Sequence, residues 1–190
     1  LPKCKAAPGL VADIVVSNAD AAFTSGQLLP AAARRRWTDR RLERAAYSMG
    51  LFVWYFGTDR TYPDVPHHTI ALGPRYRGLL DDVFDRHVLA PDFSLYLHRP
   101  TATDPSLAPP GGDAFYGLSP VPHLDAAVDW NEAAEGYRAA IAARLSATLL
   151  PGLERHVVTS RVLTPLQFRD DYRSVKGAAF SLEPRLSQSA

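Results

Sequence analysis

The chain has 190 residues, a net charge of +1, 46% hydrophobic residues and 22% charged residues. This is the composition of an ordinary globular protein of one domain, or of one domain and part of another. So small a net charge argues against nucleic acid as a partner, and no run of about 18 or more apolar residues is present that could cross a membrane. There is no signal-peptide pattern, and the single cysteine, Cys4, cannot form an internal disulfide, so we expect a cytoplasmic protein.

The first regular elements are predicted after an irregular stretch over residues 1–10. Residues 11–17, VADIVVS, form a continuous apolar run typical of a strand buried on both faces. Asn18, Ala19 and Asp20 follow directly, and Asn18 is predicted to cap a helix that continues to residue 28. A buried strand that turns sharply into a helix is the βα unit of a nucleotide-binding layer.

Residues 30–44 are predicted to form a second helix, which is rich in arginine. Asp39 and Glu43 alternate with the arginines at helical spacing, which favours a solvated or ion-paired face. Contact with anionic lipid headgroups is the alternative. Nucleic acid is disfavoured because no aromatic stacking platform accompanies the charges.

The most apolar run of the chain, YSMGLFVWYF over residues 47–56, predicts a central strand. Alternation places Leu51, Val53 and Tyr55 on one face and Phe52, Trp54 and Phe56 on the other. Both faces are bulky, so either both are covered or one lines a cavity. Residues 67–72, HHTIAL, are predicted as an antiparallel partner for it. The adjacent His67 and His68 would point to opposite faces of that strand and could not chelate one metal ion, so we expect no metal site.

The remaining elements predict an α+β or mixed α/β fold, with helices packed on a mixed or antiparallel sheet. They are a helix over 75–88, two strands over 92–98 and 114–119 joined by a proline-rich loop, a long helix from 129 to 149, a strand over 156–163 and a helical turn over 165–172.

No catalytic residues can be assigned from the sequence. Ser119, His123 and Asp125 sit together in one predicted loop, without a nucleophile elbow or an oxyanion element. The acidic pairs at 81–82 and 170–171 are interpreted as polar helix faces. No GxGxxG fingerprint follows any predicted strand, so the chain lacks a cradle for a dinucleotide pyrophosphate.

Long strings of the sequence resemble one family. DFSLYLHRPTATDPSLAP and AFYGLSPVPHL are similar to the middle of the bacterial phytoene desaturases, FAD-dependent carotenoid desaturases of the flavin amine-oxidase superfamily. The similarity continues through YSMGLFVWYFG, HHTIALGPRYRGLLDDVF, LLPGLERHVVTSRVLTPLQFRD and GAAFSLEPRLSQSA, and covers almost everything after Val11. The chain is thus expected to be a middle-to-C-terminal fragment, inactive alone, of an enzyme that forms conjugated polyenes from phytoene at the membrane surface.

The resemblance implies a division of the chain and a set of site residues. Residues 1–30 and 166–190 would belong to an incomplete Rossmann-like FAD domain, with Asn18, Ala19 and Asp20 either near the flavin or only capping a helix, and residues 31–165 would bind substrate. The family carries its glycine-rich flavin motifs before and after the region matched here, so FAD and the remainder of its domain would come from the full-length parent. The aromatic strands would form a core or the wall of a tunnel for the lipophilic carotenoid, with Phe52, Trp54, Tyr55, Phe56, Phe115, Tyr116 and Leu118 as the tunnel candidates.

Three alternatives stay open at this level. The parent could be a related desaturase that acts on later carotenoids, or an isomerase or oxygenase on the same fold, because substrate choice depends on the shape of the tunnel. The chain could also be a non-catalytic module that binds lipids or carotenoids.

Overall fold

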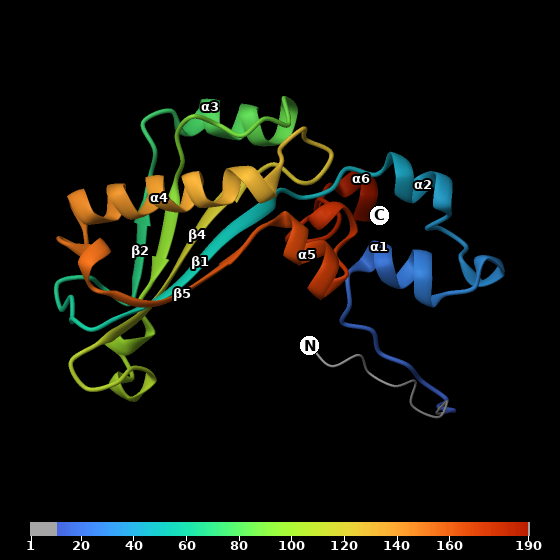
Figure 1. Ribbon diagram of the computed structural model, residues 1–190. Helices are drawn as coiled ribbons and strands as arrows, with labels where there is room; N and C mark the ends of the chain where they lie inside the picture. The colour runs from blue at the N-terminus through green and yellow to red at the C-terminus, as the bar shows by residue number, and fades with distance from the viewer. Residues whose placement is uncertain (1–10, 190) are drawn as a thin grey trace.

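The computed structural model describes residues 11–189, which are organised around a five-stranded sheet (Figure 1). Residues 1–10, including Cys4, lie outside the described part of the chain. The strands are ordered β2-β3-β4-β1-β5, and every neighbouring pair is antiparallel. The predicted α+β fold with an antiparallel sheet is therefore confirmed. The strands are β1 (Gly50–Thr58), β2 (His68–Ala71), β3 (Leu95–His98), β4 (Asp113–Val121) and β5 (Val157–Leu163).

The helices lie mainly on one side of the sheet and at one of its ends (Figure 1). The longest, α4 (Trp130–Thr148), begins where the Asp129 carboxylate accepts a hydrogen bond from the Asn131 amide at 2.9 Å. The others are short: α1 (Ala21–Phe23), α2 (Asp39–Arg44), α3 (Tyr76–Leu80), α5 (Pro165–Tyr172) and α6 (Leu186–Ser189), with π turns over Thr24–Leu28 and Asp81–Asp85 and 3-10 turns over Ala31–Ala33, Pro100–Ala102, Pro105–Leu107, Leu153–Arg155 and Val175–Gly177.

The main core fills the space between the sheet and α4. From β1, Phe52 and Trp54 are 0% exposed, because strand alternation turns them toward the apolar stripe of the helix. The Phe52 ring meets the Tyr137 ring edge-on, with centroids 4.9 Å apart. The predicted assignment of Phe52, Trp54 and Phe56 to one face of this strand is thus confirmed, and α4 is what covers that face.

The predicted strand over residues 11–17 is wrong. Val11, Ile14 and Val16 are 103%, 82% and 89% exposed, and no strand of the described sheet pairs with this segment. A strand buried on both faces requires neighbouring strands, and without them an apolar run gains nothing from a regular extended form. The helix that follows is present, but its cap is Asp20 and not Asn18, because the Asp20 carboxylate accepts from the Phe23 amide at 2.7 Å.

The predicted helix over residues 30–44 is broken into two pieces, Ala31–Ala33 and α2. The break falls where the Thr38 hydroxyl caps α2 by accepting from the Arg41 amide, an alternative to the helical backbone that threonine commonly offers. The ion-paired character of the segment is confirmed, since the Arg34 guanidinium contacts the Asp39 carboxylate. The Arg41 guanidinium lies 4.8 Å from the centre of the Trp37 ring.

The predicted partner of the central strand is also corrected. β4 pairs with β1 over all nine residues, from Gly50 opposite Val121 to Thr58 opposite Asp113, and β5 occupies the other edge of β1. Both edges of β1 are therefore filled. The 67–72 segment, as β2, pairs with β3 at the edge of the sheet.

A small second cluster forms beside the sheet from the two ends of the described chain. Ala22, Leu42 and Tyr47 from the first third pack with Ala178 from the last. The Gln188 side-chain amide donates to the Ala46 carbonyl and accepts from the Ala46 amide. These two hydrogen bonds connect α6 to the segment that leads into β1. Among residues 11–189, no helix is both long enough and apolar enough to span a bilayer.

Candidate functional site

The face of the sheet opposite α4 is the candidate functional site. Figure 1 shows that α4 and α3 lie on one side of the strands, and α5 contacts the other side only near one end. Strand pairing places His68, His98, Tyr116 and Tyr55 in one row across β2, β3, β4 and β1. The next row is Ile70, Tyr96, Leu118 and Val53. We call these two rows the open face.

Apart from His68 and His98, the open face is apolar and aromatic, and it is partly exposed to solvent except at Val53, which is buried at the end near α5. Tyr55 and Ile70 are 43% and 71% exposed. The Tyr116 ring joins its neighbours, with its centroid 5.6 Å from that of Tyr55 and 5.8 Å from that of Tyr96. Such a surface is suited to contact with an apolar partner or ligand.

The seven tunnel candidates are divided between the two faces of the sheet. Tyr55, Tyr116 and Leu118 belong to the open face. Phe52 and Trp54 are completely buried under α4 and can contact no ligand while that helix is in place. In the described residues they belong to the core, and their assignment to a tunnel wall stays a prediction.

The other two candidates, Phe56 and Phe115, are 3% exposed and help to line a groove at the end of the sheet. This groove has a volume of about 350 Å³ and lies between the ends of β1 and β5 and the proline-rich loop. Its volume is within the range of small-ligand sites, and it includes Tyr55 of the open face. The groove residues Leu107, Pro109 and Val158 were missed because only the fold brings them beside β1.

Asn18, Ala19 and Asp20 lie in the turn before α1. One Asp20 oxygen caps the helix, and its other oxygen is buried without a partner among the described residues. A carboxylate at this helix start would repel a phosphate, and no glycine-rich turn precedes it. The described residues thus do not fit the pyrophosphate of FAD.

The residues considered for acid-base or nucleophilic chemistry have structural contacts. The buried Ser119 hydroxyl lies 3.1 Å from the Ser94 carbonyl oxygen and 2.8 Å from the Tyr137 hydroxyl. Asp82 is buried and binds the guanidinium groups of Arg75 and Arg86, at 2.8 and 3.1 Å. Asp82 is thus polar in its contacts, as expected of a polar helix face, but these contacts are ion pairs at a buried position.

The Tyr137 hydroxyl should make stability depend on alkaline pH. Burial raises its pKa from 10.0 to about 12, although the bond to Ser119 lowers it. Above pH 10 the unfolded chain loses this proton before the folded one does, so the free energy of unfolding should fall by roughly 2–3 kcal/mol as pH rises from 10 to about 12. Urea unfolding at a series of pH values measures this fall.

Tyr137→Phe should flatten that pH dependence. Part of it should remain, because burial also raises the pKa of Tyr47 to about 12. Tyr76→Phe, at an exposed position, is the matched control. An unchanged slope in Tyr137→Phe would contradict the assignment of the effect to this buried hydroxyl.

Three histidines meet at one corner of the open face, contrary to the prediction. His67 precedes the first residue of β2, so strand alternation does not separate it from His68, and their ring centroids are 4.4 Å apart. The register of β2 and β3 places His98 directly opposite His68. One ring nitrogen from each of the three lies within 4.8 Å of the others. The prediction that His67 and His68 point to opposite faces is wrong.

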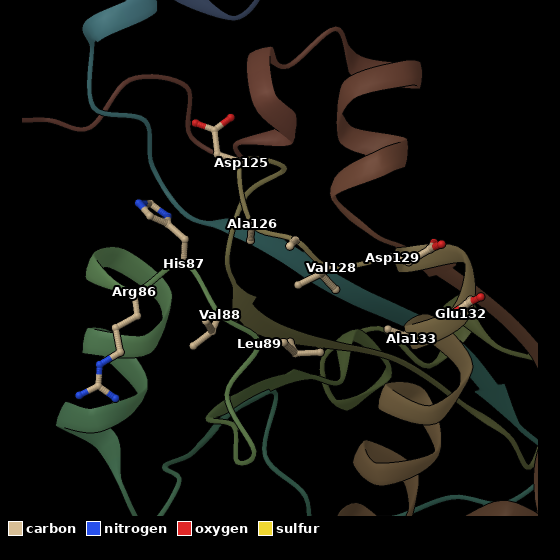
Figure 2. Close-up of a pocket in the computed structure, with 11 residues that line it drawn as sticks. Arg86, His87, Val88, Leu89, Asp125, Ala126, Val128, Asp129, Glu132 and Ala133 are labelled. Atoms are coloured by element: carbon tan, nitrogen blue, oxygen red, sulfur yellow. The ribbon is translucent and has the colours of Figure 1, made fainter.

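A second, larger cavity of about 740 Å³ lies between the end of the 81–85 turn and the start of α4. Its lining combines apolar side chains such as Val88 and Leu89 with charged groups of both signs, Arg86, Asp125 and Glu132 (Figure 2). In Figure 2 the Arg86 side chain points away from the acidic groups, so the charges do not converge on one point. None of the predicted site residues lines this cavity.

Comparison with known proteins gives relatives for nearly the whole chain. It is 53% identical over 186 residues to the neurosporene-forming phytoene desaturase of Cereibacter sphaeroides. This match covers 95% of this chain and 36% of the relative. It is 47% identical to the lycopene-forming phytoene desaturase of Pseudescherichia vulneris, over 94% of this chain and 36% of the relative. The all-trans-zeta-carotene desaturase of Myxococcus xanthus is 42% identical, over 91% of this chain and 33% of the relative. No protein-family model matches the chain.

The chain is therefore homologous to a segment of the carotenoid desaturases. Its matches at 53% and 47% identity are to segments of two bacterial phytoene desaturases. It spans about a third of the length of these relatives, with 36% covered in each of the two phytoene desaturases.

Proposed function

We propose that this chain is the substrate-binding segment of a carotenoid desaturase, which dehydrogenates a long isoprenoid hydrocarbon such as phytoene to a conjugated polyene. The observation that carries the proposal is the 53% identity over 95% of the chain to a phytoene desaturase. Because the chain matches only 36% of that relative, the reaction is proposed for the full-length parent and not for this segment alone.

The open face and the adjoining groove suit such a substrate. A hydrocarbon has no polar group to recognise, so it can be held only by apolar contact, at about 25 cal/mol per Å² of buried area. Tyr55, Tyr116 and Leu118 offer such area at the surface, and the groove of about 350 Å³ extends it past the end of β1. We propose that these residues align the hydrocarbon substrate and exclude water from it.

FAD is proposed as the cofactor of the parent protein, held by glycine-rich segments outside this sequence. Residues 1–30 and 166–190 are proposed to belong to the FAD domain. Ala22 and Leu42 pack against Ala178, which supports a single unit formed from the two ends of the described chain. Because Tyr47 belongs to the same cluster, the N-terminal part of this unit would extend to about Tyr47. A peripheral position at the cytoplasmic membrane surface is proposed for the parent, because the substrate dissolves in lipid.

A chimeric enzyme tests the proposed function. In the Cereibacter sphaeroides phytoene desaturase, the matching segment is replaced by this chain, and the purified chimera is supplied with FAD and phytoene-loaded liposomes. We expect desaturated products to form, with the unmodified relative as the positive control. A folded chimera that binds flavin and leaves phytoene unchanged would contradict the proposal.

The second candidate function is desaturation of a later carotenoid, which is favoured by the 42% identity to a zeta-carotene desaturase. The same chimera supplied with zeta-carotene instead of phytoene distinguishes the two. A non-catalytic carotenoid-binding module is the outcome if the 190-residue chain binds phytoene without flavin while the chimera is inactive on both substrates.

The open face should matter for turnover and not for folding. In the chimera, Tyr55→Asp places a charge in the proposed path of the hydrocarbon, and the lost apolar contact should lower kcat/KM for phytoene about 10-fold or more. Tyr76→Asp, at an exposed position of α3, is the matched control and should leave turnover unchanged. Equal turnover in both variants would show that the open face does not contact the substrate.

A further inference from the structure

The three-histidine cluster at the corner of the open face is not used by the proposed function. His67 and His98 are half-buried and His68 is exposed. Their ring centroids lie 4.4, 4.6 and 5.2 Å apart. The cluster is held by the backbone as well, because the His67 carbonyl accepts from the Arg99 amide at 2.9 Å and His68 pairs with His98 across β2 and β3.

The outer nitrogens of two rings are already engaged. His67 Nδ1 lies 2.5 Å from the Thr103 hydroxyl, and His68 Nδ1 lies 2.7 Å from the Tyr96 hydroxyl. A ring that donates its Nδ1 proton to an oxygen has the free electron pair on Nε2. Metal-binding histidines are typically oriented in this way, by a hydrogen bond from the nitrogen that does not bind the metal.

The inner nitrogens face one another without an acidic partner. His67 Nε2 and His98 Nε2 are 2.7 Å apart, a distance that requires one shared proton. A metal ion in place of this proton would need the nitrogens about 3.3 Å apart in tetrahedral geometry, with metal–nitrogen bonds of about 2.0 Å. The His67 and His98 rings would therefore turn slightly apart, and the His68 nitrogen, which lies within 4.8 Å of theirs, would close on the same ion.

We propose that His67, His68 and His98 bind one divalent transition-metal ion through three imidazole nitrogens. Imidazole ligands suit zinc, copper and nickel, and three of them leave a coordination position for water or another small ligand. The exposed side of His68 gives the ion access from solvent. The ion would join edge strand β2 to β3 at the border of the open face, independently of the function proposed above.

Zinc titration of the purified 190-residue protein tests this site. With Zn²⁺ in competition with a chromogenic chelator, we expect one ion per chain. The same site loaded with Co²⁺ should show visible absorption typical of a nitrogen-ligated ion. No binding above the background of the chelator assay would overturn the proposal.

Substitutions locate the ion within the chain. His68→Asn, at an exposed position, and His98→Asn should each weaken zinc binding by on the order of 100-fold or more and remove the cobalt spectrum. Tyr96→Phe keeps all three ligands and should weaken binding about 10-fold to 100-fold, by releasing the His68 ring. Circular dichroism shows whether each variant is folded.

His156→Asn is the matched control, because His156 bonds Asp59 at 2.8 Å beside β5, away from the cluster. It should bind zinc as the unmodified chain does. Zinc binding that survives His68→Asn and is lost in His156→Asn would overturn the assignment.

Discussion

Replacing Phe52 by alanine should lower the free energy of unfolding by about 3–5 kcal/mol, as is usual for a phenylalanine removed from a closed core. Phe52 is 0% exposed and touches two aromatic rings of α4, those of Trp130 and Tyr137. Its removal leaves a cavity at the junction of sheet and helix that neither element can fill. Urea unfolding followed by circular dichroism measures the change.

Tyr55→Ala is the control for this prediction, on the same strand but on the open face. Tyr55 is 43% exposed, so its removal should change the free energy of unfolding by about 1 kcal/mol or less. Equal losses for the two variants would mean that α4 does not close the Phe52 face in solution.

Removing the Asp113 carboxylate should be equally damaging for an electrostatic reason. Asp113 is 5% exposed and accepts hydrogen bonds from the Tyr62 amide at 2.7 Å and the Thr101 hydroxyl at 2.5 Å. The guanidinium of Arg99, itself 9% exposed, lies 3.7 Å away. Asp113→Ala leaves that buried cation unpaired, which should cost about 3–5 kcal/mol of unfolding free energy.

A double variant separates the buried charge from the lost hydrogen bonds. If the unpaired cation dominates, Asp113→Ala combined with Arg99→Met should be more stable than Asp113→Ala alone, since the apolar side chain needs no partner. Thermal or urea unfolding of the two variants, at the same pH and salt concentration, makes the comparison. Strictly additive losses would contradict the coupling of these two side chains.

The sequence was sufficient to predict the long helix and the two faces of the central strand. The alternation in residues 50–58 correctly separated Phe52 and Trp54 from Val53 and Tyr55, because side chains in a strand alternate whatever surrounds them. The long helix was predictable from its apolar spacing and from Asp129 at its start. The long strings shared with phytoene desaturases also led directly to the family.

The tertiary structure alone decided which face of the central strand is covered by a helix and which side chains meet on each face of the sheet. The strand pattern does not say that α4 covers Phe52 and leaves Tyr55 open, because both faces are equally bulky. His98 meets His68 only through the pairing of β2 with β3, which follows from β4 and β5 filling the edges of β1. The run at 11–17 reads as a buried strand, yet it finds no partner in the described sheet, since hydrogen bonding between strands is a property of their neighbours and not of the segment itself.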